Sequence, residues 1–145
     1  MTSTGLAVFD ETVQLSNVWL NELTRAVDWE DRARSYRLLR ATLHALRDRL
    51  MAHEAVHLGA QLPMLLRGVY YEGWHMRDTA PKERTKREFL AHVEAAFKRD
   101  PNVDTEGLVK EVFKILAHRI SPGEIDDVKN ALPAEVRALW PNGAG

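Results

Sequence analysis

Apolar residues recur every three or four positions along most of the chain, which is the period of an amphipathic helix. The first such stretch predicts a helix from about Asp10, which can cap its N-terminus, to about Val27. A second helix is expected after Trp29, ending at about Leu50. The residues expected to face the core in these two helices are Val13, Leu20, Leu23 and Val27, then Tyr36, Leu39, Leu43, Leu46 and Leu50.

Pro63 divides the following segment into two short helices. Proline lacks the amide proton that a helix interior needs, but it fits the first position of a new helix. We therefore expect one helix over about 52–62 and another over 63–71, which Gly73 ends. A linker of mixed charge follows at 75–84.

The second half of the chain predicts helices in the same order. One is expected over 85–98, and the next begins where Asp104 or Thr105 can cap it. Residues 121–124, Ser-Pro-Gly-Glu, have the pattern of a capping box with proline at the first helical position. Pro133 opens the last short helix. Because no segment alternates as a strand would, we predict an all-α fold with about eight helices.

The sequence resembles itself when it is shifted by about 70 positions, without a gap. The matched pairs include Arg49 with Arg119, Leu62-Pro63 with Leu132-Pro133, and Arg67 with Arg137. Scattered apolar matches arise by chance, but proline and arginine matches in the same register do not. We predict a single bundle-like domain over 1–145, built from two tandem four-helix repeats that bury a shared core. The first copy spans 9–74 and the second 79–143.

The composition is that of an ordinary soluble domain. The chain has 145 residues, of which 45% are apolar and 28% charged, enough for one core. It has no cysteine, which excludes disulfides and thiolate metal sites. No apolar run approaches the roughly 20 residues of a membrane helix, and no secretory signal is evident. We expect a cytoplasmic protein that does not bind membranes, and the net charge of −1 gives no general attraction to nucleic acid.

Residues 53–57, His-Glu-Ala-Val-His, match a zinc-peptidase motif. On a helix, this spacing puts His53 and His57 one turn apart as metal ligands, with Glu54 beside them as the general base. The candidates for a third ligand are Glu72, His75 and Asp78.

The repeat argues against this zinc site. The second copy has Gly123 and Asp127 where the first has the two histidines, so the same element is expected to fold without imidazoles. With six histidines in the chain, a chance match to so short a motif is ordinary. We therefore expect no metal and no other cofactor, and a zinc-dependent hydrolase is kept as the alternative function.

The predicted second helix is rich in arginine and could bind phosphates. Its arginines are Arg32, Arg34, Arg37, Arg40, Arg47 and Arg49. The equivalent helix of the second copy has mixed charges, which favours a solvated face paired with acids such as Glu22, Glu30 or Asp31. Nucleic-acid binding is therefore the second alternative.

The segment 67–75 is the predicted partner-binding site. Aromatic residues with polar tips suit interfaces, although such clusters also pack in cores. Arg67 recurs as Arg137, which is more typical of a structural bridge to a helix end or a carboxylate than of a ligand clamp. The site residues that we predict are Arg67, Tyr70, Tyr71, Trp74 and His75.

Three stretches together resemble a known family. They read RLLRATLHALRDRL, AQLPMLLRGVYYEGW and ISPGEIDDVKNALPAEVRALWP. The chain is similar to the bacterial domain-of-unknown-function family 2267 from about Phe9 to Pro141. The resemblance implies a small, all-helical, cytoplasmic bacterial protein and brings no activity, catalytic residue or cofactor. The helix start at His53 more usually reads like the one at Ser121 in this family, so the histidines depart from its pattern.

These observations favour a non-enzymatic interaction or binding module over an enzyme. We expect a protein partner or self-association, and a regulatory or stress-associated role. This expectation depends on the absence of a persuasive catalytic constellation, since a fold class alone does not specify a function.

Overall fold

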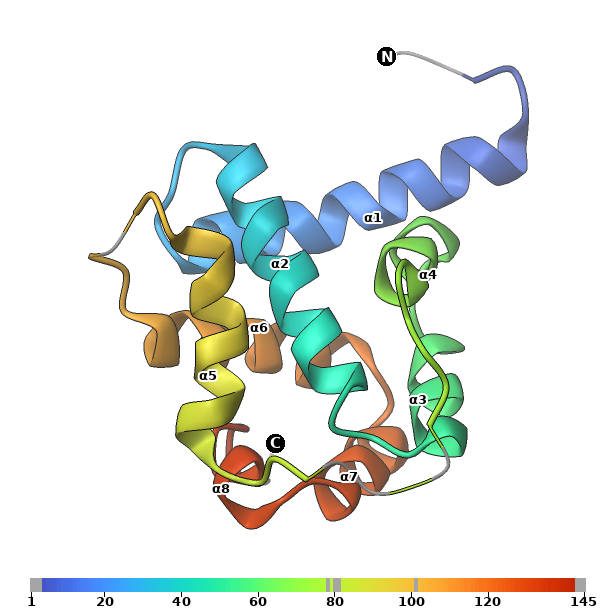
Figure 1. Cartoon of the computed structure of the whole chain (residues 1–145). Coiled ribbons are helices and arrows are strands. Elements are labelled where there is room, and N and C mark those ends of the chain that lie inside the picture. Colours follow the sequence, from blue (N-terminus) through green and yellow to red (C-terminus); the bar gives the residue numbers. More distant parts are fainter. Residues whose placement is uncertain (1–3, 78, 80–81, 101, 143–145) are drawn as a thin grey trace.

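The computed structural model describes residues 4–77, 79, 82–100 and 102–142. Within these ranges the chain forms helices and no strand, which confirms the all-α class (Figure 1). The elements are α1 (Ala7–Ala26), α2 (Arg32–Arg47), α3 (Ala52–Gly59), α4 (Met64–Tyr71), α5 (Lys86–Glu94), the 3-10 helix η1 (Ala95–Phe97), α6 (Thr105–Arg119), α7 (Pro122–Ala131) and α8 (Ala134–Arg137).

The helices of both halves pack around one hydrophobic core. α2 contacts α1, α4, α5 and α6, and so lies at the centre of the bundle (Figure 1). α6 in turn packs against α1, α5 and α7, and α3 packs against α7. Helices from the first half therefore bury their apolar faces against helices from the second. The repeat boundaries at 9–74 and 79–143 stay a prediction.

Most of the predicted core positions are buried. Those that the structure confirms as buried are Leu23, Leu39, Leu43, Leu46 and Leu50. The prediction was wrong for Val13 and Tyr36, each of which exposes 40% of its surface. Helical periodicity identifies the face on which a residue lies, but it does not say how far the neighbouring helices extend along that face.

The helix ends show which capping signals operate. Asp31 caps α2 by accepting hydrogen bonds from the backbone amides of its first turn, and Asp104 caps α6. Ser121 accepts a hydrogen bond from the amide of Glu124, so half of the predicted capping box forms. The complete capping box lies at α5, where Thr85 and Glu88 bond to each other's backbone amides.

α1 begins earlier than predicted. Leu6, not Asp10, occupies the N-cap position, and the Asp10 carboxylate lies in the first turn. One of its oxygens accepts a hydrogen bond of 2.7 Å from the amide of Thr4. In Figure 1 the N-terminal end of this helix reaches past α4 and beyond the other helices. No described helix is long and apolar enough to cross a membrane.

Candidate functional site

Arg67 is a structural bridge to a helix end. Its Nε donates a 3.0 Å hydrogen bond to the carbonyl of Gly59, and its Nη2 donates one of 3.0 Å to the carbonyl of Leu62. These carbonyls lie at the end of α3, where backbone acceptors lack partners within the helix. The sequence-based preference for a bridging arginine is confirmed, with a helix end as the acceptor.

The aromatic part of the segment packs largely inside. Tyr70 is fully buried, and its hydroxyl donates a 2.7 Å hydrogen bond to the carbonyl of Ala55. Tyr71 is half-buried between Tyr70 and Trp74, at ring-centroid distances of 4.9 and 5.5 Å. A Cβ at Gly59 would collide with the Tyr71 ring, so the glycine permits this packing.

The five predicted site residues of segment 67–75 differ in exposure: Tyr70 is buried, and Arg67 and Tyr71 are partly buried. Trp74 is half-buried against the core and His75 is exposed. Since Tyr70 is inaccessible, it cannot contact a partner in this conformation. Partner binding by the remaining residues stays a prediction.

The arginines at the C-terminal end of α2 bind groups of the protein itself. Arg47 is buried, and its Nη1 donates to the carbonyls of Tyr70 and Glu72 at 2.6 and 2.7 Å. The side chain of Glu72 pairs with Arg40 at 2.9 Å. Arg49 is also buried and pairs with Glu83. These guanidinium groups hold α4 and the linker to α2 and do not form a free cationic face.

Two arginines at the N-terminal end of α2, Arg32 and Arg34, also contact other groups of the protein. Arg34 pairs with Asp100 and lies 3.9 Å from the ring centroid of Trp29, a cation–π contact. Arg32 donates a 2.6 Å hydrogen bond to the side chain of Asn17. Among the described residues, the arginines of the predicted second helix pair with the acids Asp48, Glu72, Glu83 and Asp100. In these ranges they do not pair with the expected acids Glu22, Glu30 and Asp31.

The His-Glu-x-x-His motif lies on the surface of α3. His53 exposes 66% of its side chain, and its Nε2 lies 3.0 Å from the carboxylate of Glu54. The rings of His53 and His57 are 6.4 Å apart. Nowhere in the described ranges do three potential His, Cys, Asp or Glu ligands gather into a metal site. Of the candidate third ligands, Glu72 pairs with Arg40, and residue 78 lies outside the described residues.

Six exposed apolar residues lie between residues 6 and 18, and helical geometry places them on two sides of α1: Leu6, Phe9 and Val13 on one, and Val8, Leu15 and Val18 on the other. We call Leu6, Phe9 and Val13, together with Met64 and Leu65 of α4, the apolar face. The two helices meet where the amide of Leu65 donates a 2.9 Å hydrogen bond to the Thr12 hydroxyl. This surface was not predicted from the sequence, because Val13 was expected to lie in the core. The spacing of Leu6, Phe9 and Val13, which begins before the predicted helix start, could have indicated this surface.

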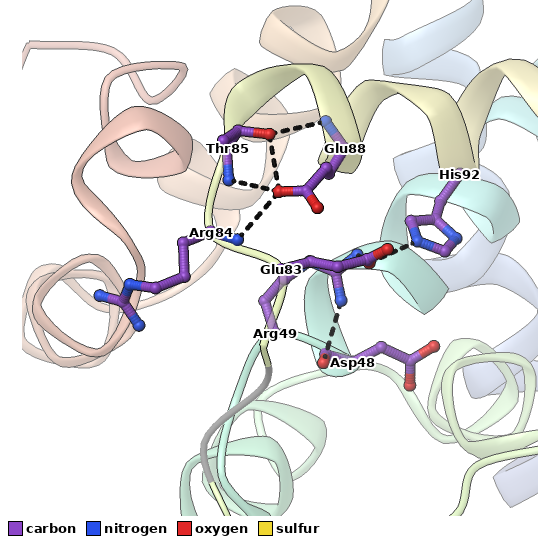
Figure 2. Close-up of polar contacts among 7 residues, drawn as sticks. All are labelled: Asp48, Arg49, Glu83, Arg84, Thr85, Glu88 and His92. Carbon is purple, nitrogen blue, oxygen red and sulfur yellow. Dashed lines mark hydrogen bonds and ion pairs between the residues drawn. The ribbon is translucent and has the colours of Figure 1, made fainter.

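A polar pocket lies between the end of α2, the linker and α5. Figure 2 shows Arg49 and His92 converging on the carboxylate of Glu83 from α2 and α5, while the side chain of Arg84 points away. Arg49 Nη2 and His92 Nε2 lie 2.5 and 2.8 Å from the same oxygen of Glu83. Because this network joins elements far apart in the sequence, the spacing of residues along the chain does not predict it.

Two partly buried carboxylates outside this pocket, Glu124 and Glu22, have shifted pKa values. Burial raises the pKa of Glu124 on α7, and the nearby charge of Asp127 adds to this effect. Burial alone would also raise the pKa of Glu22 on α1, but hydrogen bonds from His118 and Arg119 outweigh it and lower this pKa.

The chain is similar to a family of known proteins. None of the curated proteins matches it. The family described as "Uncharacterized conserved protein (DUF2267)" matches residues 16–139, which is most of the 145 residues. The all-helical protein described above therefore belongs to the DUF2267 family.

Proposed function

We propose that this protein is a non-enzymatic interaction module that self-associates through the apolar face of α1 and α4. The observation that carries the proposal is the concentration of exposed apolar side chains at one end of the molecule. Six of the twelve large apolar residues that are exposed in the described structure lie between residues 6 and 18. Large exposed apolar patches mark interaction sites, whereas isolated exposed residues do not.

The spacing of these residues supports a helix as the occupant. Leu6, Phe9 and Val13 are separated by three and four positions, and the same spacing continues through Leu20 and Leu23. Leu23 is buried and Leu20 is half-buried in the protein's own core, but the residues nearer the N-terminus have no such cover. A second helix with the same spacing would extend the packing outward.

The size of the face supports a second copy of this chain as that occupant. Its five side chains expose 40–54% of their surface. They therefore present on the order of 500 Å², against roughly 800 Å² that each partner buries in a standard interface. In a two-fold dimer each α1 contributes the same face, so one apolar surface covers the other without any further binding element.

The apolar face lies mainly before the part of the chain that the family shares. The family match begins at residue 16, and not near Phe9, so the three residues Leu6, Phe9 and Val13 of the face precede it. Substitutions in this stretch leave the matched region unchanged. Cytoplasmic location, bacterial origin and a regulatory or stress-associated role stay predictions.

Sedimentation equilibrium of the full chain tests the proposal. We expect a dimer of the 16.5 kDa chain at micromolar concentration, and a monomer with unchanged circular dichroism for Phe9→Glu. Tyr36→Glu is the matched control, because Tyr36 is a similarly exposed aromatic residue on α2, outside the apolar face. A monomeric wild-type protein at about 100 µM overturns the proposal, and so does equal dissociation by both variants.

A further inference from the structure

The pocket between α2 and α5 has the dimensions of a small-molecule site. Its volume is about 430 Å³, within the roughly 300–1,000 Å³ that such sites occupy. It is lined by Asp48 and Arg49 at the end of α2, by Arg77, Thr79, Lys82 and Glu83 of the linker, and by His92 of α5. It lies apart from the apolar face, and its lining is polar.

The carboxylates of the pocket are already neutralised by cations of the protein. Asp48 lies 3.2 Å from the guanidinium of Arg47. Glu83 is bound by both Arg49 and His92. An entering anion would therefore meet two carboxylates whose charge is balanced, not two free negative charges.

The remaining cations of the pocket leave an excess of positive charge. Within the described ranges, neither Arg77 nor Lys82 has a carboxylate at ion-pair distance, and both line the cavity. Arginine binds oxyanions with two parallel hydrogen bonds, and lysine supplies a compact positive charge beside them. The charge of these two cations matches that of a phosphate monoester, which is about −1.5 to −2 at neutral pH.

The wall of the pocket is held in place before any ligand binds. Arg49 exposes only 4% of its surface, and it is fixed by its ion pair with Glu83. Arg49 thus neutralises Glu83 and holds it in the wall, which leaves Arg77 and Lys82 as the source of the excess positive charge.

We propose that this pocket binds a small molecule that carries a phosphate monoester group. Arg77 and Lys82 contact the phosphate oxygens, and Arg49, Glu83 and His92 form the fixed wall. The pocket shares no residue with the apolar face, so the proposal is independent of whether the protein self-associates.

Isothermal titration calorimetry with phenyl phosphate and with inorganic phosphate tests the proposal, using the full chain at low ionic strength. We expect saturable binding of one phosphate per chain. Arg77→Ala and Lys82→Ala should each weaken it at least tenfold. Arg84→Ala is the matched control, since Arg84 belongs to the same linker and carries the same charge, but it does not line the pocket and its side chain points away from Glu83 and His92 (Figure 2). This variant should bind as the wild type does.

The outcomes separate a pocket from general attraction between charges. Equal weakening by Arg77→Ala and Arg84→Ala overturns the proposal, because it shows that only net charge matters. Absence of saturation up to about 10 mM phosphate overturns it as well. Binding of phenyl phosphate but not inorganic phosphate supports the proposal and assigns part of the affinity to the body of the ligand.

Discussion

Arg67 and Arg137 use the same atoms to bind the end of the helix that precedes each of them. Arg67 Nε and Nη2 donate to the carbonyls eight and five residues earlier, both at 3.0 Å. Arg137 Nε and Nη2 donate to the carbonyls eight and five residues earlier, at 2.8 and 3.0 Å. Each arginine thereby satisfies acceptors that the helices α3 and α7 leave open. The Leu-Pro step before each arginine turns the chain so that the side chain can reach back.

Removal of either bridge should destabilise the fold. We expect Arg67→Ala and Arg137→Ala each to lower the free energy of unfolding by about 1–2 kcal/mol, since each removes hydrogen bonds made by a charged donor. Urea denaturation at pH 7 measures the change. Arg84→Ala is the control and should stay within about 0.5 kcal/mol of wild type, as exposed substitutions usually do. If all three variants unfold at the same urea concentration, these arginines do not act as bridges.

The adjacent tyrosines should respond differently to loss of the hydroxyl. Tyr70→Phe removes a buried 2.7 Å hydrogen bond to the Ala55 carbonyl, so we expect a loss of about 1–2 kcal/mol. Tyr71→Phe removes a 3.4 Å contact at the surface, so its effect should stay within about 0.5 kcal/mol. Thermal and urea unfolding of the two variants make the comparison. Equal effects would show that burial of the hydroxyl is not the deciding factor.

Glu124 should make the protein less stable as pH rises. Burial, with the charge of Asp127, raises its pKa in the folded state above that in the unfolded state. The folded protein therefore holds the proton more tightly, and stability falls between the unfolded and the folded pKa. We expect Glu124→Gln to resemble wild type at acidic pH and to be more stable than wild type above the raised pKa. Urea denaturation from pH 4 to pH 8 tests this, and a difference that does not vary with pH contradicts it.

Glu22 should show the opposite dependence. Burial opposes its ionisation, but hydrogen bonds from His118 and Arg119, at 2.8 and 2.7 Å, outweigh burial and lower the folded pKa. The stabilisation is fully present above the unfolded pKa and is lost as pH falls through the folded pKa. Glu22→Gln should therefore be less stable than wild type at pH 7, and the difference should shrink at acidic pH. A deficit that grows on acidification would show that the pair does not stabilise the folded state.

Helix identity could be derived from the sequence because it depends on local chemistry. Pro63 separates α3 from α4, Asp104 begins α6, and Ser121 begins α7, each through hydrogen bonds or steric limits within a few residues. The bridging role of Arg67 was also foreseeable, because its acceptors lie in the preceding turn of chain. The family resemblance rested on these same local patterns, and it is confirmed.

Only the tertiary structure decided which apolar and charged groups are covered. Val13 has the spacing of a core residue, yet it is exposed, because α4 packs against the neighbouring Thr12 and leaves this side of α1 uncovered. Tyr70 is an aromatic residue with a polar tip, as many interface residues are, yet it is fully buried and its hydroxyl donates to a carbonyl of α3. Arg49 pairs with Glu83, which lies 34 residues later in the chain, and the path of the linker determines this pairing. The sequence by itself determined the all-α class and the helix boundaries at Pro63, Asp104 and Ser121, since these depend on neighbours along the chain. The candidate surfaces depend on which helices meet, and that is settled by packing.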